Sequence, residues 1–139
     1  MFTPEHLEQA NALSKGNLVE HLGIVFVPSA PGTFAATMPV QASTHQPMGL
    51  LHGGATAALA ETVGSMGSAL LIDPRTQAIV GIEVNANHIK GVRSGQVTCT
   101  GTLLHRGRTT HVWDFKVTSD QGDLVAVCRL VNLVIDRRP

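Results

Sequence analysis

"HQPMGLLHGGATAALAETVGSMG", residues 45–67, is the most informative segment of this sequence. It combines glycines and a run of small apolar residues with a single charge, Glu61. Between residues 55 and 72, small and apolar residues cover nearly the whole circumference of a helix, which is typical of a helix buried on every side. The segment therefore predicts a long buried helix from about residue 52 to residue 72, ended by Asp73-Pro74.

Patterns typical of β-strands lie on both sides of this helix. Before it, LGIVFVPSAPGTFAATMPV predicts two strands and follows a short helix that begins at Thr3-Pro4-Glu5. The predicted strands are 22–28, 33–39, 77–89, 95–105, 110–118 and 124–135. Short turns between consecutive strands, such as SDQGD at 119–123, imply an antiparallel sheet that the long helix must pack against. We predict an α+β fold: an antiparallel β-sheet wrapped around one long central helix.

Composition and charge restrict the function classes. The chain has 139 residues, 43% of them hydrophobic and 14% charged, which predicts one globular domain over residues 1–139. Ten basic residues balance ten acidic ones, so the sequence lacks the overall basic field on which non-specific nucleic-acid binding rests. No signal-peptide pattern and no apolar run of membrane-spanning length occur. We expect neither nucleic acid nor membrane as a partner.

The cysteines and histidines favour neither a disulfide scaffold nor a metal site. Cys99 and Cys128 lie in strand-like stretches, and we expect them to be reduced residues of a cytoplasmic protein. A disulfide between them is possible but is not needed in a chain of this length. The seven histidines form no H-x-x-x-H or Cys-His cluster, so no metal ligands are predicted.

The carboxylate of Glu61 requires an explanation, because burying an unpaired charge is costly or raises its pKa. One explanation is a structural ion pair with Lys90, Arg93 or an arginine within residues 106–108. The other is catalysis by a carboxylate tuned by its apolar surroundings. The helix pattern alone favours neither.

The start of the helix shifts the balance towards catalysis. At His52-Gly53-Gly54 the first N–H groups have no acceptor within the helix, and with the helix dipole they can bind an oxygen that gains negative charge. Gly53 and Glu61 are eight residues apart, which corresponds to ~12 Å along a helix. Groups so far apart cannot act on one carbonyl unless they come from different subunits. We therefore predict a two-fold dimer whose helices run antiparallel and share two active sites.

The segment QPMGLLHGGATAALAETVGSMG resembles the signature of hotdog-fold thioesterases, above all the 4-hydroxybenzoyl-CoA thioesterase type with a helix glutamate. It is also similar to 1,4-dihydroxy-2-naphthoyl-CoA thioesterase and to the proofreading thioesterase of enterobactin synthesis. The resemblance covers about residues 18–135. It implies a hotdog fold and hydrolysis of an aromatic or hydroxyaryl acyl-CoA. It also implies no metal or bound cofactor, since CoA is part of the substrate, and a homodimer that forms a homotetramer.

The resemblance also assigns roles to particular residues. It implies that Glu61 is the nucleophile or general base, and that Gly53 supplies the oxyanion N–H after the motif histidine, His52. It implies that Gln46 orients the thioester and that the Ser65 hydroxyl holds Glu61 or a water. Each residue also has a structural alternative: Gln46 could bond loop backbone, His52 could cap the helix, and Ser65 could bond back to the Glu61 carbonyl.

A second stretch, NANHIKGV at 85–92, resembles the strand that lines the acyl and pantetheine channel. Asn85 and His88 are its candidates for reaching the site, although His88 could equally be a core or edge histidine. Many relatives have Arg-Pro where this chain has Lys90-Gly91, which leaves the role of Lys90 open.

A third stretch, HRGRTTH at 105–111, resembles the turn that meets the CoA nucleotide. Arg106 and Arg108, on either side of Gly107, could pair with its phosphates, or the turn could be a solvated basic loop. Two alternatives to hydrolysis remain. A hotdog hydratase or dehydratase would use a different histidine–carboxylate motif, and a non-catalytic acyl-CoA-binding protein would have no need of a buried carboxylate.

Overall fold

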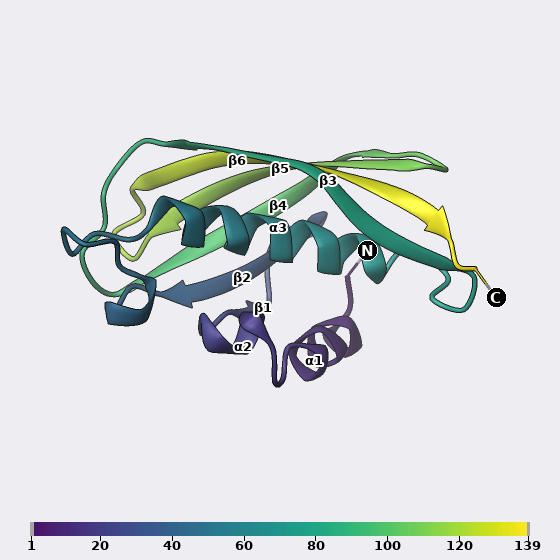
Figure 1. Ribbon diagram of the computed structural model, residues 1–139, viewed down its shortest axis with the longest axis horizontal. Helices are drawn as coiled ribbons and strands as arrows, with labels where there is room; N and C mark the ends of the chain where they lie inside the picture. Colours follow the sequence, from purple (N-terminus) through teal and green to yellow (C-terminus); the bar gives the residue numbers. More distant parts are fainter. Residues whose placement is uncertain (1, 139) are drawn as a thin grey trace.

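The computed structural model describes residues 2–138, and Figure 1 shows one sheet laid over a long helix. The helical elements are α1 (Pro4–Leu13), α2 (Leu18–His21), the 3-10 turn η1 (Ala42–Thr44) and α3 (Gly53–Ala69). The strands are β1 (Val25–Val27), β2 (Thr33–Pro39), β3 (Gln77–His88), β4 (Gln96–Arg106), β5 (Thr110–Ser119) and β6 (Leu124–Asp136). No helix in this described range has the length and apolar composition to span a bilayer.

The six strands form one antiparallel sheet in the order β1-β2-β4-β5-β6-β3. The sheet curves around α3, which is the hotdog arrangement that the sequence predicted (Figure 1). All six predicted strands are present, with ends that differ by a few residues. The order of the strands in the sheet differs from their order in the sequence. β3 pairs with β6 at one edge, and the chain then crosses past β6 and β5 to form β4. This crossing leaves β3 at an edge.

One face of α3 packs tightly on the sheet because it carries glycines there. A Cβ on Gly64 would lie 2.7 Å from the Phe115 ring, and a Cβ on Gly67 would lie 2.7 Å from the Trp113 ring. Both rings are fully buried beneath the helix. Close approach of the α3 backbone to β5 therefore depends on the absence of side chains at these two positions.

The prediction that α3 is buried on every side is wrong for the single chain. Ala58, Glu61, Thr62, Ser65 and Met66 line a hollow beside the helix and are only partly buried. The sheet covers one side of the helix, and the short helix α2 borders the other side with Leu18 and Val19. An apolar pattern around the whole circumference of a helix does not reveal whether the same chain buries both sides of that helix.

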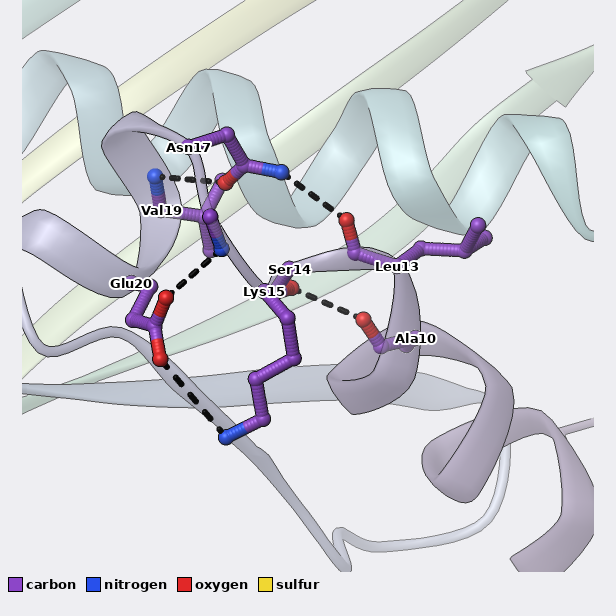
Figure 2. A network of polar contacts seen from close by, with 8 residues as sticks. Ala10, Leu13, Ser14, Lys15, Asn17, Val19 and Glu20 are labelled. Atoms are coloured by element: carbon purple, nitrogen blue, oxygen red, sulfur yellow. Dashed lines mark hydrogen bonds and ion pairs between the residues drawn. The ribbon is translucent and has the colours of Figure 1, made fainter.

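The helix α2, which the sequence analysis missed, is held by the polar link between α1 and α2 in Figure 2. The Asn17 side chain accepts a hydrogen bond from the Val19 N–H at 3.0 Å and donates one to the Leu13 carbonyl at 2.9 Å. Glu20 accepts a hydrogen bond from the Gly16 N–H and thereby closes the turn. The link places Val19 against the core and beside α3.

Candidate active site

The N-terminus of α3 presents one free backbone donor. His52 is the N-cap, and its Nδ1 accepts a hydrogen bond from the Gly54 N–H at 2.8 Å. The carbonyl of His52 accepts hydrogen bonds from the N–H groups of Ala55 and Thr56. Within residues 2–138 no acceptor takes the Gly53 N–H. His52 thus caps the helix, and Gly53 keeps the donor that can bind a substrate oxygen.

A cavity of about 280 Å³ surrounds this donor. Its lining comes from the loop before α3, the first turn of α3, the end of β3 and the segment after it, namely Gln46, Leu50, Leu51, Gly53, Thr56, His88, Ile89, Lys90, Gly91, Val92 and Val125. The imidazole of His88 lies directly over Gly53: a Cβ at position 53 would be 2.8 Å from His88 Nε2. Glycine at position 53 therefore leaves room for His88 beside the free N–H.

Gln46 reaches the same cavity from a loop that its own side chain shapes. Its Oε1 accepts hydrogen bonds from the N–H groups of Met48 and Leu50, and its backbone N–H donates to the Leu50 carbonyl at 2.8 Å. The alternative that Gln46 bonds loop backbone therefore describes its side-chain oxygen, Oε1. Its amide group is half-buried at the wall of the cavity.

Glu61 lies in the middle of α3, in a second hollow. It borders a largely apolar groove of about 340 Å³, formed with Leu18, Val19, Ala58, Thr62, Ser65 and Met66. Its carboxylate reaches over β3 at Gly81, where a Cβ would lie 2.7 Å from Glu61 Oε1. Gly81 adjoins the β-bulge of β3, and its lack of a side chain lets the carboxylate rest against the sheet.

The structural ion pair considered for Glu61 is absent among the described residues. Lys90 pairs instead with Asp123, with 2.6 Å between Nζ and Oδ2. Arg106 donates from Nη2 to the Leu71 carbonyl at 2.7 Å, just beyond the end of α3. Glu61 is thus left without an ion-pair partner among the described residues, at the border of an apolar groove.

The two hollows are separate within one chain. They share no lining residue, and eight residues of helix, ~12 Å, separate Gly53 from Glu61. Ser65 lies one turn after Glu61 in the same groove. The separation that the sequence predicted is therefore present in the folded chain.

Other predicted residues are not brought to either hollow. Asn85 lies on the outer face of the sheet, because strand alternation turns it away from His88, and its Nδ2 donates to Glu83 Oε1 at 3.0 Å. Arg106 and Gly107 lie beyond the C-terminal end of α3, far from Gly53. Arg108 is exposed in the same turn.

A buried polar network under α3 was missed by the sequence analysis. The Ser68 hydroxyl accepts hydrogen bonds from Trp113 Nε1 at 2.9 Å and from Asn132 Nδ2 at 3.1 Å, and lies 2.9 Å from His111 Nδ1. Burial lowers the pKa of His111, and Arg106 and His105 lower it further. The available signal was a polar residue, Asn132, at an inward position of an otherwise apolar strand.

Comparisons with known proteins agree on one family. The family model of the thioesterase superfamily matches residues 48–126. Proofreading thioesterase EntH of Cronobacter sakazakii is 45% identical over 93% of this chain and 93% of its own length. A mutant of thioesterase PA1618 from Pseudomonas aeruginosa is 46% identical, with a TM-score of 0.92 over 94% of each chain. Thioesterase HI1161 from Haemophilus influenzae is 40% identical, with a TM-score of 0.89 over 98% of this chain and 92% of its own.

Proposed function

Because this chain belongs to the thioesterase superfamily and is a thioester hydrolase, we propose that it hydrolyses an acyl-CoA to the free acid and CoA, with Glu61 and Gly53 as its reactive groups. The observation that carries the proposal is that α3 presents two groups at different positions: a free N–H at its start and an unpaired carboxylate in its middle. These groups match the two demands of thioester hydrolysis, which are stabilisation of an oxyanion and activation of a nucleophile.

The Gly53 N–H is the proposed oxyanion donor. A substrate carbonyl placed in the 280 Å³ cavity would accept this N–H at the positive end of the helix dipole. The amide of Gln46 lies at the wall of the same cavity and can help to orient the thioester. His88 covers the Gly53 backbone, so its proposed role is to shape the cavity beside the carbonyl.

Glu61 is the proposed base or nucleophile. As a general base it takes a proton from water, and the water oxygen attacks the thioester carbon. As a nucleophile it attacks that carbon itself and forms an anhydride, which water then cleaves. In both routes the C–S bond breaks and the sulfur of CoA leaves. Neither route needs a metal or a bound cofactor.

We further propose that the site is shared between two copies of the chain. Two features support a dimer: the outer edge of β3, a strand of 12 residues, pairs with no strand of residues 2–138, and the groove side of α3 is partly exposed. Pairing of two β3 edges about a two-fold axis would bring two α3 helices side by side and antiparallel. The outer face of the sheet, with Val80, Val131, Leu133 and Ile135, is the proposed contact between dimers in a tetramer.

The acyl group and the compartment complete the proposal. The apolar groove beside Glu61 suits an aromatic or hydroxyaryl acyl group, as the resemblance to aryl-CoA thioesterases implies. Among the basic residues of the 105–111 turn, Arg108 is the better candidate for the CoA phosphates, because the Arg106 guanidinium is already bonded to Leu71. The free thiols of Cys99 and Cys128 are compatible with the cytoplasm, where thiols stay reduced.

The test is release of free thiol from a panel of aryl- and acyl-CoA thioesters by wild type, Glu61→Ala and Glu61→Gln. We expect turnover by wild type and a loss of at least about 1,000-fold in kcat in both variants, with the fold and oligomeric state unchanged. Activity on carrier-protein thioesters but not on CoA thioesters would change the substrate class. Full activity in Glu61→Gln would refute the assigned role. Inert wild type with tight CoA binding would favour a binding protein, and water addition to an enoyl-CoA would favour a hydratase.

A further inference from the structure

Asn132 is the buried group next to the proposed site whose bonding is incomplete. Its side chain is fully buried in β6. Within residues 2–138, Asn132 Oδ1 is the one buried side-chain nitrogen or oxygen atom without a hydrogen-bond partner. Native proteins rarely leave such an atom unsatisfied, so an unsatisfied acceptor beside a reactive carboxylate calls for a functional explanation.

The network around Asn132 fixes the orientation of its amide group. Asn132 Nδ2 donates to the Gly64 carbonyl at 3.2 Å and to Ser68 Oγ at 3.1 Å. A carbonyl can only accept, so exchanging the nitrogen and oxygen of the amide would place two acceptors together at Gly64. The Ser68 hydroxyl oxygen also accepts a hydrogen bond from Trp113, so both lone pairs of that oxygen are used. The proton of the Ser68 hydroxyl is then directed to His111. The network therefore has no donor left for Oδ1.

Asn132 Oδ1 and the Glu61 carboxylate both lie close to Gly81. Asn132 and Gly81 are partners across the β3–β6 ladder. A Cβ built on Gly81 would lie 3.5 Å from Asn132 Oδ1 and 2.7 Å from Glu61 Oε1. The two oxygens thus lie no more than about 6 Å apart, above a residue that has no side chain.

We propose that Asn132 is a positioning residue that accepts a hydrogen bond from Glu61 when the carboxyl group carries a proton during hydrolysis. This inference rests on the proposed function, in which Glu61 acts on the thioester. While Glu61 is a carboxylate, it and Oδ1 are both acceptors and form no hydrogen bond. Once Glu61 is protonated, its O–H can donate to Oδ1. The interaction exists only after proton transfer, so it favours the transition state over the ground state.

This arrangement selects the general-base route. Water forms a bond from its oxygen to the thioester carbon, its proton passes to Glu61, and the negative charge goes to the carbonyl oxygen on the Gly53 N–H. The C–S bond then breaks, and Glu61 returns the proton to sulfur, which yields acid and CoA thiol. On the anhydride route Glu61 attacks without a proton, and Asn132 would contribute nothing to that step.

Among residues 2–138, no other charged side chain lines the groove that holds Glu61. On neighbouring elements, Glu20 pairs with Lys15, Glu83 bonds Asn85 and Asp114 pairs with Arg129, whereas His21 of α2 and Asp136 of β6 lie outside the groove lining. His111 lies behind Ser68, and burial lowers its pKa, which favours its neutral form. The proposed hydrogen bond to Asn132 therefore acts on Glu61 at the step in which Glu61 holds the proton taken from water.

The test compares Asn132→Leu with Ser68→Ala in the native oligomer, with benzoyl-CoA hydrolysis followed from pH 4.5 to pH 8. Asn132→Leu removes Oδ1, whereas Ser68→Ala removes hydrogen bonds to three side chains and leaves Oδ1 in place. For Asn132→Leu we expect kcat to fall about 10- to 100-fold with KM nearly unchanged, and the acid limb of the kcat profile to move to lower pH. For Ser68→Ala we expect lower thermal stability with an unmoved acid limb.

Equal effects in the two variants, or an acid limb unmoved by Asn132→Leu, would overturn the inference and leave Asn132 a structural residue.

Infrared difference spectra of wild type provide a second test that needs no variant at position 132. The protonated Glu61 band, identified by its loss in Glu61→Gln, should have the lower carbonyl frequency of a carboxylic acid that donates a hydrogen bond, and the frequency of a free acid would contradict the proposal. An inactive Glu61→Gln beside a fully active Asn132→Leu would refute this inference alone, whereas an active Glu61→Gln would refute the proposed function.

Discussion

Replacement of Gly81 by alanine should reduce catalysis while leaving the fold intact. The new Cβ would lie 2.7 Å from Glu61 Oε1, whereas ordinary contacts begin at 3.4 Å, so the carboxylate must retreat by about 0.7 Å. The backbone at Gly81 is outside the positive-φ region, and alanine therefore adds no backbone strain. The only close contact is the end of a flexible side chain, which can move.

The size of the effect follows from this displacement. A misplacement of about 1 Å can cost about 100-fold in rate, so a shift of this size should lower kcat by about 10- to 100-fold. In free energy this is about 1.4–2.7 kcal/mol of transition-state stabilisation. Forcing Glu61 off its rotamer costs about 0.5–1.5 kcal/mol of stability, which lowers Tm by only a few degrees. Thiol release measures the first quantity and a thermal melt the second.

A double-mutant cycle provides the matched control. In a Glu61→Ala background there is no carboxylate to displace, so Gly81→Ala should cause no further loss of the residual activity. Undiminished kcat in the single variant, or the same loss in both backgrounds, would refute the idea that Gly81 acts by admitting the Glu61 carboxylate.

Three further predictions concern other residues. Gly53→Ala places a Cβ 2.8 Å from His88 Nε2, so the ring must move and kcat/KM should fall about 100-fold in the thiol-release assay; an unchanged value would remove Gly53 from the site. Burial raises the pKa of the Cys99 thiol and raises that of Cys128 to about 11, so an aromatic disulfide reagent at pH 8 should titrate neither thiol in the native protein and both in denaturant. Rapid labelling of the native protein would contradict this. Burial lowers the pKa of His111 below its usual 6.5, so the unfolded state binds more protons and stability should decline as pH falls below 6.5. Urea denaturation between pH 8 and pH 5 should show this decline, and His111→Asn should weaken it; an identical decline in the variant would assign it to other groups.

Much of the architecture could be predicted from local patterns. Period-two alternation located all six strands, and the apolar helix before Asp73-Pro74 was found with its ends within a few residues. The helix α2 was missed because four residues are too few to show a periodic pattern. The strand order could not be obtained either, since the pairing of β3 with β6 depends on contacts between segments far apart in the chain.

The candidate site was predictable where its residues share one short segment. Gly53 and Glu61 lie on one helix, whose geometry sets their spacing, and Gln46 lies in the loop just before that helix. The structure places His88 at the cavity beside Gly53 and Asn85 on the opposite face of the sheet, because three residues along a strand reverse the side of the sheet.

Helix periodicity, strand alternation and the motif at 45–67 depend on neighbours in the chain, and they were sufficient to establish the α+β architecture and the ~12 Å separation of Gly53 from Glu61. The bonding state of each polar group depends on neighbours in space. Only the folded chain decided that Glu61 has no ion-pair partner among the described residues, that it rests over Gly81, and that Asn132 Oδ1 lies near the same glycine without a donor from residues 2–138. A carboxylate and an amide seventy-one residues apart meet because β3 and β6 pair, and no local pattern contains that pairing.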